Sequence, residues 1–191
     1  MFGGGRFVAA TVAAVVVVSA LGACAGDTGS TGAANEVTLA QSKSYAQLLR
    51  NEASSRLPDI VLKQVAESSD VSIACDESDP EGLSRSWTSS MSILVTNSTA
   101  ARIQKVADDL AESFVAQGWK AKLADESTDT LVVTRLRSAT SLADIAIAAT
   151  SKGDDQAPSI QITATGVCAL TDGPESDEVT MLEGLDPENA G

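Results

Sequence analysis

The stretch 97–119, NSTAARIQKVADDLAESFVAQGW, carries the clearest structural signal in this chain. Its apolar residues recur at the spacing of one helical face, and Asn97 and Ser98 offer side chains that can cap the helix start. Gly118 stands where a residue beyond the last helical turn belongs. The apolar face consists of Ile103, Val106, Ala107, Leu110 and Phe114. We therefore predict a helix over 99–117.

The segments on both sides of this helix have the period of strands. Before it, Trp87–Val95 alternates polar and apolar residues, which is typical of a half-buried strand. After it, four more segments alternate or are rich in branched residues. These are Trp119–Leu123, Leu131–Arg137, Ala143–Ala149 and Ile160–Cys168. Short, polar links separate them, and such links favour an antiparallel meander.

The residues ahead of the strands predict further elements. Ser42–Leu57 has helical spacing and ends at Pro58, while Asp59–Glu67 could form a second short helix and Asp70–Cys75 alternates as a strand. The sheet has one apolar face, which the helices should cover. The fold class is therefore α+β, a two-layer sandwich with helices on one face of an antiparallel, mostly meandering sheet. We expect a single domain over 42–170 with a βαβββ core order.

The C-terminal residues 171–191 lack this periodicity. Nine acidic residues and no basic one occur between Gly153 and Gly191. We predict a mostly disordered acidic tail over 171–191. Four apolar residues within it could form one short docking turn. They are Val179, Met181, Leu182 and Leu185.

The N-terminus has the pattern of an export signal. Arg6 precedes an apolar run, Phe7–Ala20, which is shorter than the roughly 20 residues of a membrane-spanning helix. Leu21-Gly22-Ala23-Cys24 then resembles the lipobox of bacterial lipoproteins. The resemblance implies a signal peptide over 1–23 and acyl chains on Cys24, followed by a flexible tether over 24–41. An ordinary signal peptide cut near Ala23, or an uncleaved anchor, is the alternative.

Net charge and cysteine count restrict the binding partners and the cysteine chemistry that we expect. The chain of 191 residues has a net charge of −13, and removal of 1–23 takes away one basic residue and leaves −14. Such a chain should not bind nucleic acid or anionic lipid head groups by charge, so acyl chains would have to hold it at a membrane. With Cys24 lipidated, Cys75 and Cys168 remain, and outside the cell they most simply form a disulfide. Two free thiols or a redox pair are the alternatives.

Several kinds of active site are missing from the sequence. The chain has no histidine, which excludes Ser-His-Asp and Cys-His nucleophile systems and histidine-based metal sites. We find no cofactor motif and expect no cofactor. Asp125, Ser127 and Asp129 imitate the start of a calcium-binding EF-hand loop, but Thr130 and Leu136 stand where glycine and glutamate are required. We therefore predict no metal site.

The remaining candidate site residues have two interpretations each. Trp87 and Trp119 could line a ligand groove, although both are in phase with apolar strand residues and core packing is favoured. The acidic loop 76–84 could supply paired carboxylates for a hydrolase, but a solvated loop explains it more simply. Four cations could form a basic stripe on the open face of the sheet, or could be ordinary solvated residues. They are Lys120, Lys122, Arg135 and Arg137.

Taken together, the lipobox, the Ala- and Gly-rich tether and the Cys75–Trp87–Cys168 pattern resemble small lipoproteins of high-GC Gram-positive bacteria. The resemblance implies a lipid-anchored protein on the extracytoplasmic face of the cell membrane, with no catalytic residue. We expect a non-enzymatic module that binds a surface protein or an envelope component. A carrier of lipid or another small ligand, with a cavity between helices and sheet, is the first alternative, and a carboxylate-based envelope hydrolase is the second. The oligomeric state stays open.

Overall fold

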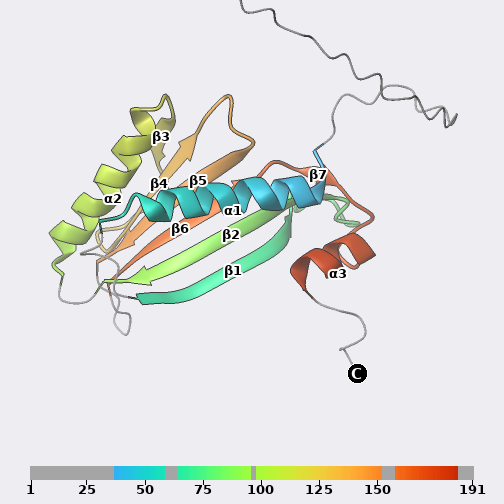
Figure 1. Cartoon of the computed structure of the whole chain (residues 1–191), viewed down its shortest axis with the longest axis horizontal. Helices are drawn as coiled ribbons and strands as arrows, with labels where there is room; N and C mark the ends of the chain where they lie inside the picture. Colours follow the sequence, from blue (N-terminus) through green and yellow to red (C-terminus); the bar gives the residue numbers. More distant parts are fainter. Residues whose placement is uncertain (1–36, 59–63, 96–97, 152–157, 185–191) are drawn as a thin grey trace, which may run out of the picture. The chain divides into compact units, whose positions relative to one another are not determined.

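A computed structural model describes residues 37–58, 64–95, 98–151 and 158–184 of this chain. The predicted signal peptide, Cys24 and the predicted tether up to residue 36 lie outside the described residues. In the part that is described, three helices accompany one antiparallel sheet of seven strands, which is not closed into a barrel (Figure 1). This arrangement confirms the predicted α+β fold class with helices packed on the sheet.

The sheet is built from a meander and a hairpin that meet in its middle. Its order is β1-β2-β6-β5-β4-β3, with β7 paired to the end of β2. The strands are β1 (Gln64–Ala74), β2 (Ser84–Leu94), β3 (Lys120–Leu123), β4 (Leu131–Arg137), β5 (Ala143–Thr150), β6 (Ser159–Gly166) and β7 (Ala169–Leu170). The last four predicted strands form the meander from β3 to β6, and β6 then pairs with β2, which is distant in sequence.

Helices α1 (Leu39–Ser55) and α2 (Ala100–Val115) cover one face of the sheet (Figure 1). The side chains of Trp87, Ile162 and Phe114 are at most 1% exposed in the layer between them. Burial of each such side chain contributes roughly 1.5–3 kcal/mol to folding. Thr99 caps α2, because its hydroxyl accepts a hydrogen bond from the backbone N–H of Arg102. The cap is therefore one residue beyond the predicted Ser98, and the other predicted cap, Asn97, lies outside the described residues.

Helix α1 begins three residues earlier than predicted. Thr38 and Gln41 form a capping box, in which each side chain accepts a hydrogen bond from the other residue's backbone N–H. Leu39 is fully buried, which adds a core contact to the first turn. The predicted tether over 24–41 therefore overlaps the start of the helix.

Strand β1 replaces part of a predicted helix. Residues 64–67 belong to β1, so the short helix predicted over 59–67 is wrong there, and 59–63 lie outside the described residues. The segment is rich in serine and pairs with β2 from Gln64 to Ala74, with one irregularity between Val65 and Glu67. Pairing with a neighbouring strand thus prevails over a weak helical pattern.

A serine from α1 fills a break in the sheet. Pairing of β6 with β2 stops at Thr165, and β7 resumes it only at Ala169. In the break, the Ser42 hydroxyl accepts a hydrogen bond from the backbone N–H of Trp87 (3.1 Å) and donates one to the carbonyl of Val167 (2.8 Å). Ser42 therefore joins the two strands where their own backbones have separated.

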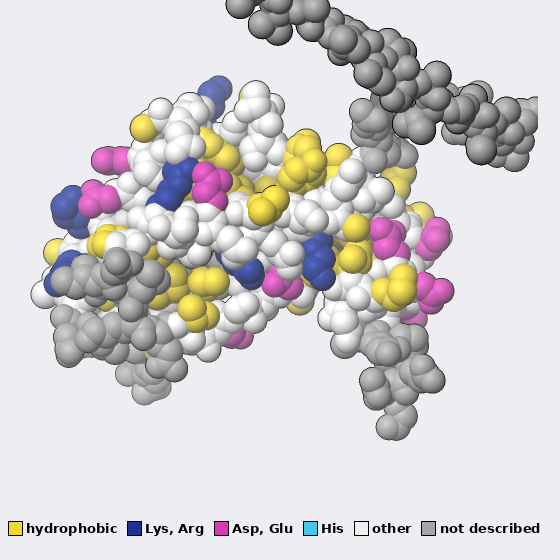
Figure 2. Space-filling view, in the orientation of Figure 1, with side chains coloured by type: hydrophobic (Ala, Val, Ile, Leu, Met, Phe, Trp, Pro, Cys, Tyr) yellow, Lys and Arg dark blue, Asp and Glu magenta, His cyan; other side chains and the backbone are white. Residues whose placement is uncertain are grey.

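The C-terminal segment is more ordered than predicted. Residues 177–183 form helix α3 (Asp177–Glu183), and Val179 is only 1% exposed. Predicted disorder is therefore wrong for this part of the tail. Of the predicted docking turn, Val179 and Leu182 pack on the core, Met181 is exposed, and Leu185 lies outside the described residues. The carboxylate of Glu183 accepts a hydrogen bond from the backbone N–H of Ser72 on β1 (2.9 Å). Figure 2 looks onto the face with α1, where acidic side chains gather at the end beside α3.

Candidate functional site

The two remaining cysteines form the predicted disulfide. Cys75 follows β1 and Cys168 lies between β6 and β7, and their Cα atoms are 6.2 Å apart. Both residues are exposed. The bridge ties together two strands that both pair with β2. It lies beside the break in the sheet and forms one border of the surface described below.

The two tryptophans do not share a groove. Trp87 on β2 is fully buried under α1, and Trp119 stands just before β3, with β6, β5 and β4 between their strands. The Trp119 ring packs edge-on against Phe114, with 5.3 Å between ring centroids. Both residues therefore belong to the core or its border, as the favoured interpretation predicts.

A polar network surrounds Trp87 under α1. Asp70 on β1 accepts hydrogen bonds from Trp87 Nε1, Gln47 Nε2 and Arg50 Nη1, each 3.1 Å long. Burial, the largest effect, raises the pKa of Asp70, but the nearby Ser89 hydroxyl and these three partners lower it, and the lowering prevails. The network fixes α1 on the sheet and leaves no carboxyl in the protonated state that a general acid needs.

Hydrogen bonds within the acidic loop between β1 and β2 stabilise its turn. The carboxylate of Asp76 accepts hydrogen bonds from Ser78, and that of Asp79 accepts them from the backbones of Glu81 and Leu83. These bonds lower the pKa of both aspartates below the ordinary value. Carboxyls that ionise so easily suit a structural turn better than acid–base catalysis. Among the described residues, no three acidic or cysteine side chains converge as a metal site.

The predicted basic stripe forms on the face of the sheet opposite α1 and α2. Lys120 lies opposite Arg137, and Lys122 lies opposite Arg135, in the pairing of β3 with β4. Leu136 pairs with Ile145 on β5, and both belong to the core under the helices, so the neighbouring arginines point to the open face. The stripe therefore continues across two strands on a surface that neither α1 nor α2 covers.

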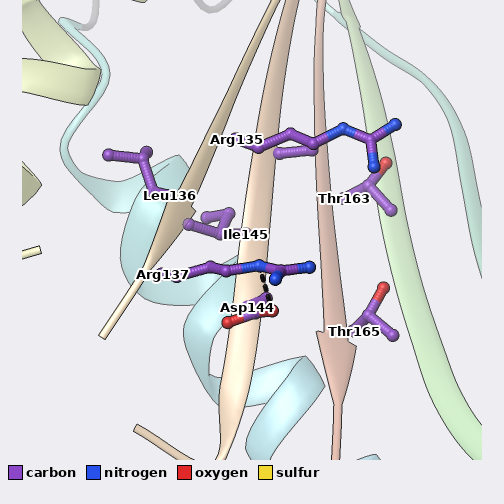
Figure 3. Close-up of a pocket in the computed structure, with 8 residues that line it drawn as sticks. Arg135, Leu136, Arg137, Asp144, Ile145, Thr163 and Thr165 are labelled. Atoms are coloured by element: carbon purple, nitrogen blue, oxygen red, sulfur yellow. Dashed lines mark ion pairs between the residues drawn. The ribbon is translucent and has the colours of Figure 1, made fainter. Parts of the chain in front are cut away.

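This open face carries a row of small and hydroxyl residues next to the cations. Arg135, Ala146 and Thr163 lie side by side on β4, β5 and β6, and Asp144 lies beside Thr165 in the next row. In Figure 3 both arginine side chains extend from β4 across β5 toward the two threonines. A hollow of ≈ 230 Å³ lies among them. The small Ala146 side chain leaves room for this hollow.

A second, wider hollow adjoins the first. It has a volume of ≈ 630 Å³ and shares Arg135, Arg137, Asp144 and Thr165 with the first hollow. The break in the sheet at 166–168, together with the disulfide and Ser86, forms its other side. The hollow exists because β6 leaves β2 at this point.

Both arginines are held in place by exposed ion pairs. Arg137 Nε lies 3.0 Å from a carboxylate oxygen of Asp144, and Arg135 donates one hydrogen bond to Glu126. The second bond lowers the pKa of Glu126 and raises that of Arg135. The arginine side chains remain 75% and 55% exposed, so each pair is weak and can be exchanged for another anion. The site can bind oxyanions and hydroxyl-bearing ligands, and it holds no nucleophile with a base.

Sequence reasoning found the cations of this site and missed its hydroxyls. Thr163 and Thr165 occupy the polar positions of β6, so a signal was present in the alternation of 159–166. The two threonines lie beside the cations because β5 pairs with β6. The short link between these strands favours that pairing. The hollow itself had no local signal.

The described residues contain no helix long and apolar enough to span a membrane. Searches against protein-family models, curated proteins and solved structures find no match for this chain.

Proposed function

We propose that this protein is a membrane-anchored extracytoplasmic lipoprotein that acts as a non-enzymatic binding module. We further propose that the open face of its sheet is the binding surface. The lipobox at Leu21-Gly22-Ala23-Cys24 supports the anchor. The open face supports the binding role, because cations and hydroxyls there line a hollow that α1 and α2 do not cover. Its partner would be a surface protein or a component of the cell envelope.

The two alternative functions have less support. A carrier would need a cavity between helices and sheet, but fully buried side chains such as Trp87, Ile93 and Ile160 fill that layer. A carboxylate-based hydrolase would need a carboxyl with a raised pKa. Asp70, Asp76 and Asp79 all have lowered pKa values.

The anchor is tested by metabolic labelling with an alkyne fatty acid in a bacterial host. The full chain should take up the label, and the Cys24→Ser variant should not. The Cys168→Ser variant keeps Cys24 and serves as the control that should still be labelled. Equal labelling of Cys24→Ser and the unchanged chain would contradict the lipid anchor.

The binding surface is tested by photo-crosslinking in the same host. A photoreactive residue at Ser90 or Thr163, which are paired neighbours on the open face, should give discrete adducts. The same residue at Asp108 or Glu112, on the exposed side of α2, should give none. Adducts only from the α2 positions, or no adducts from either face, would contradict this surface assignment.

A further inference from the structure

We propose that the open face binds the phosphoryl group of a soluble phosphate monoester, with Arg135 and Arg137 as the anion-binding residues. This proposal rests on the function proposed above, because it names the ligand chemistry of the same surface. Lys120 and Lys122 on β3 lie opposite the two arginines and add to the positive charge there. The chain has a net charge of −13 overall. The carboxylates of Asp125, Glu126 and Asp144 pair with three of the four cations here, so the cluster keeps a local excess of one positive charge.

The spacing of the two arginines fits a tetrahedral oxyanion. They are two residues apart on β4 and point to the same face, so their Cα atoms are roughly 7 Å apart. An oxyanion that accepts N–H···O bonds of about 2.7–2.9 Å from a guanidinium on each side spans such a gap. A planar carboxylate is satisfied by the paired N–H groups of a single arginine. The arrangement of two guanidiniums therefore favours phosphate over carboxylate.

Hydroxyl donors complete the site on its third side. Thr163 and Thr165 on β6 face the arginines across β5, and Figure 3 shows both guanidinium groups directed toward them. A threonine hydroxyl can donate to an anionic oxygen without adding charge. Ala146 lies between Arg135 and Thr163 in the row, and its short side chain leaves the space for the ligand.

The existing ion pairs leave donors for a ligand. Asp144 forms an ion pair with Arg137 without a hydrogen bond, and Glu126 accepts one hydrogen bond from an Nη group of Arg135, whereas each guanidinium carries five N–H donors. Within the described residues, the other donors of both arginines have no hydrogen-bond partner. A phosphate monoester carries about −1.5 to −2 charges near pH 7, which two arginines can balance. Asp144 then becomes the one carboxylate in the hollow that repels the ligand.

The acidic chain favours a soluble ligand over a membrane surface. A protein of net charge −13 is repelled by an anionic bilayer, and the cluster is too small to reverse this over many lipids. A small monoester meets only the local field of the hollow. We therefore assign the phosphoryl group to a soluble compound rather than to a lipid head group.

The test is a titration of the purified full chain with glycerol 1-phosphate at constant ionic strength, followed by ¹H–¹⁵N spectra of the arginine Nε–H groups. Saturable shifts are expected for Arg135 and Arg137. The variants Arg135→Gln and Arg137→Gln should each weaken binding about tenfold or more. Arg102→Gln, at an exposed position on α2, is the matched control and should bind as the unchanged chain does.

A variant that binds the monoester more tightly must still be folded, so a gain of affinity tests the proposal independently of any effect on folding. Asp144→Asn removes the repelling charge and should tighten glycerol 1-phosphate binding about three- to tenfold. Acetate should bind at least about tenfold more weakly than the monoester. Vesicles of phosphatidylglycerol should bind the unlipidated Cys24→Ser chain equally with and without Arg135→Gln, because the apolar residues 7–20 remain in both chains.

The outcomes that overturn the proposal are distinct from a failure of the binding-module function. Any one of four results in solution would overturn it: no saturable shifts, equal loss of affinity in Arg102→Gln, no gain of affinity in Asp144→Asn, or acetate binding as tight as the monoester. Vesicle binding that Arg135→Gln weakens, together with no binding of the monoester, would also overturn it. If open-face crosslinks appear while the monoester does not bind, only the ligand assignment is wrong. If the crosslinks are also absent from that face, the binding surface itself is wrong.

Discussion

At the scale of single residues, Ser42 replaces a missing stretch of strand pairing. Its hydroxyl bonds both Trp87 N–H and the Val167 carbonyl, which would otherwise be buried or half-buried without a partner. Gly166 makes this possible, because a Cβ at that position would lie 2.4 Å from the Ser42 hydroxyl. The break that Ser42 bridges is the same one that opens the wider hollow.

Ser42→Ala should lower the free energy of unfolding by about 1–3 kcal/mol, because it leaves the Trp87 N–H without an acceptor in the core. Denaturant unfolding measures this change. The matched control is Ser44→Ala on the same helix, whose exposed hydroxyl bonds only the Ala40 carbonyl, and it should change stability by less than about 0.5 kcal/mol. Equal effects of the two variants would show that Ser42 does not join the strands.

Asp70 makes the stability of the fold depend on pH. Its pKa is lower in the folded state than in the unfolded chain, where it is near 3.8. Its ionised form therefore stabilises the fold above that pH, and this contribution is lost as the pH falls through the lowered folded value. The partly buried ion pair with Arg50, at 3.1 Å, belongs to the same contribution.

Asp70→Asn should destabilise the protein by about 1–3 kcal/mol at pH 7, because Arg50 then loses its charged partner. The difference in the free energy of unfolding between the variant and the unchanged chain should shrink as the pH is lowered below about 4. Chemical unfolding at a series of pH values measures both effects. Asp109→Asn, which affects only an exposed pair on α2, should show neither. A difference that persists unchanged at pH 2.5 would contradict the assignment to Asp70.

At the scale of elements, sequence periodicity predicted the helices and strands that bury one regular face. The apolar stripe of α2, the branched residues of β4 and the shared apolar faces of β5 and β6 predict bounds within a few residues of those in the structure. Strand β1 was predicted only in its second half, because its first half lacks apolar alternation and is fixed by its pairing with β2. Helix α1 starts ahead of its predicted range because the Thr38–Gln41 capping box lies before the first predicted helical residue, Ser42.

Helix α3 shows why acidic composition misled the prediction. Its first turn contains Asp177 and Glu178, which favour a helix N-terminus, and Val179 supplies one buried contact. Glu183 then bonds the backbone N–H of Ser72, which points outward from the edge strand β1. A contact between a late helix and an early strand has no local signal in the sequence.

Glu183→Ala should therefore expose the edge of β1 locally. Hydrogen exchange of the Ser72 amide should become about three- to tenfold faster, because the lost hydrogen bond is worth roughly 0.5–1.5 kcal/mol. Residue-resolved exchange by NMR measures this, and global unfolding should change by less than about 1 kcal/mol. Glu175→Ala, an exposed change just before α3, should leave the Ser72 amide unaffected. An unchanged exchange rate of the Ser72 amide in Glu183→Ala would indicate that α3 does not protect this edge of β1 from solvent.

At the scale of the whole molecule, the two faces of the sheet have different tasks. One face holds the core under α1 and α2, and the other presents cations, hydroxyls and the disulfide. The sequence alone identified the cations and the cysteines, because alternation and counting are local. It could not identify the wider hollow, because this depends on the point at which β6 separates from β2, a strand that precedes it by one helix and three strands.

Among the described residues, the disulfide is the one covalent crosslink between the β1–β2 hairpin and the end of the meander. The double variant Cys75→Ser, Cys168→Ser should show how much the disulfide contributes to the free energy of unfolding. The bridge closes a sequence separation of 93 residues, so its removal should cost about 2–5 kcal/mol, mainly because the unfolded chain gains freedom. Denaturant unfolding should give a lower midpoint together with a steeper dependence on denaturant, since a chain without the crosslink exposes more surface when unfolded. A reductant should destabilise the unchanged chain to the level of the double variant and leave the variant unaffected. If the reductant has no effect on the unchanged chain, the two cysteines are not bridged in the folded protein.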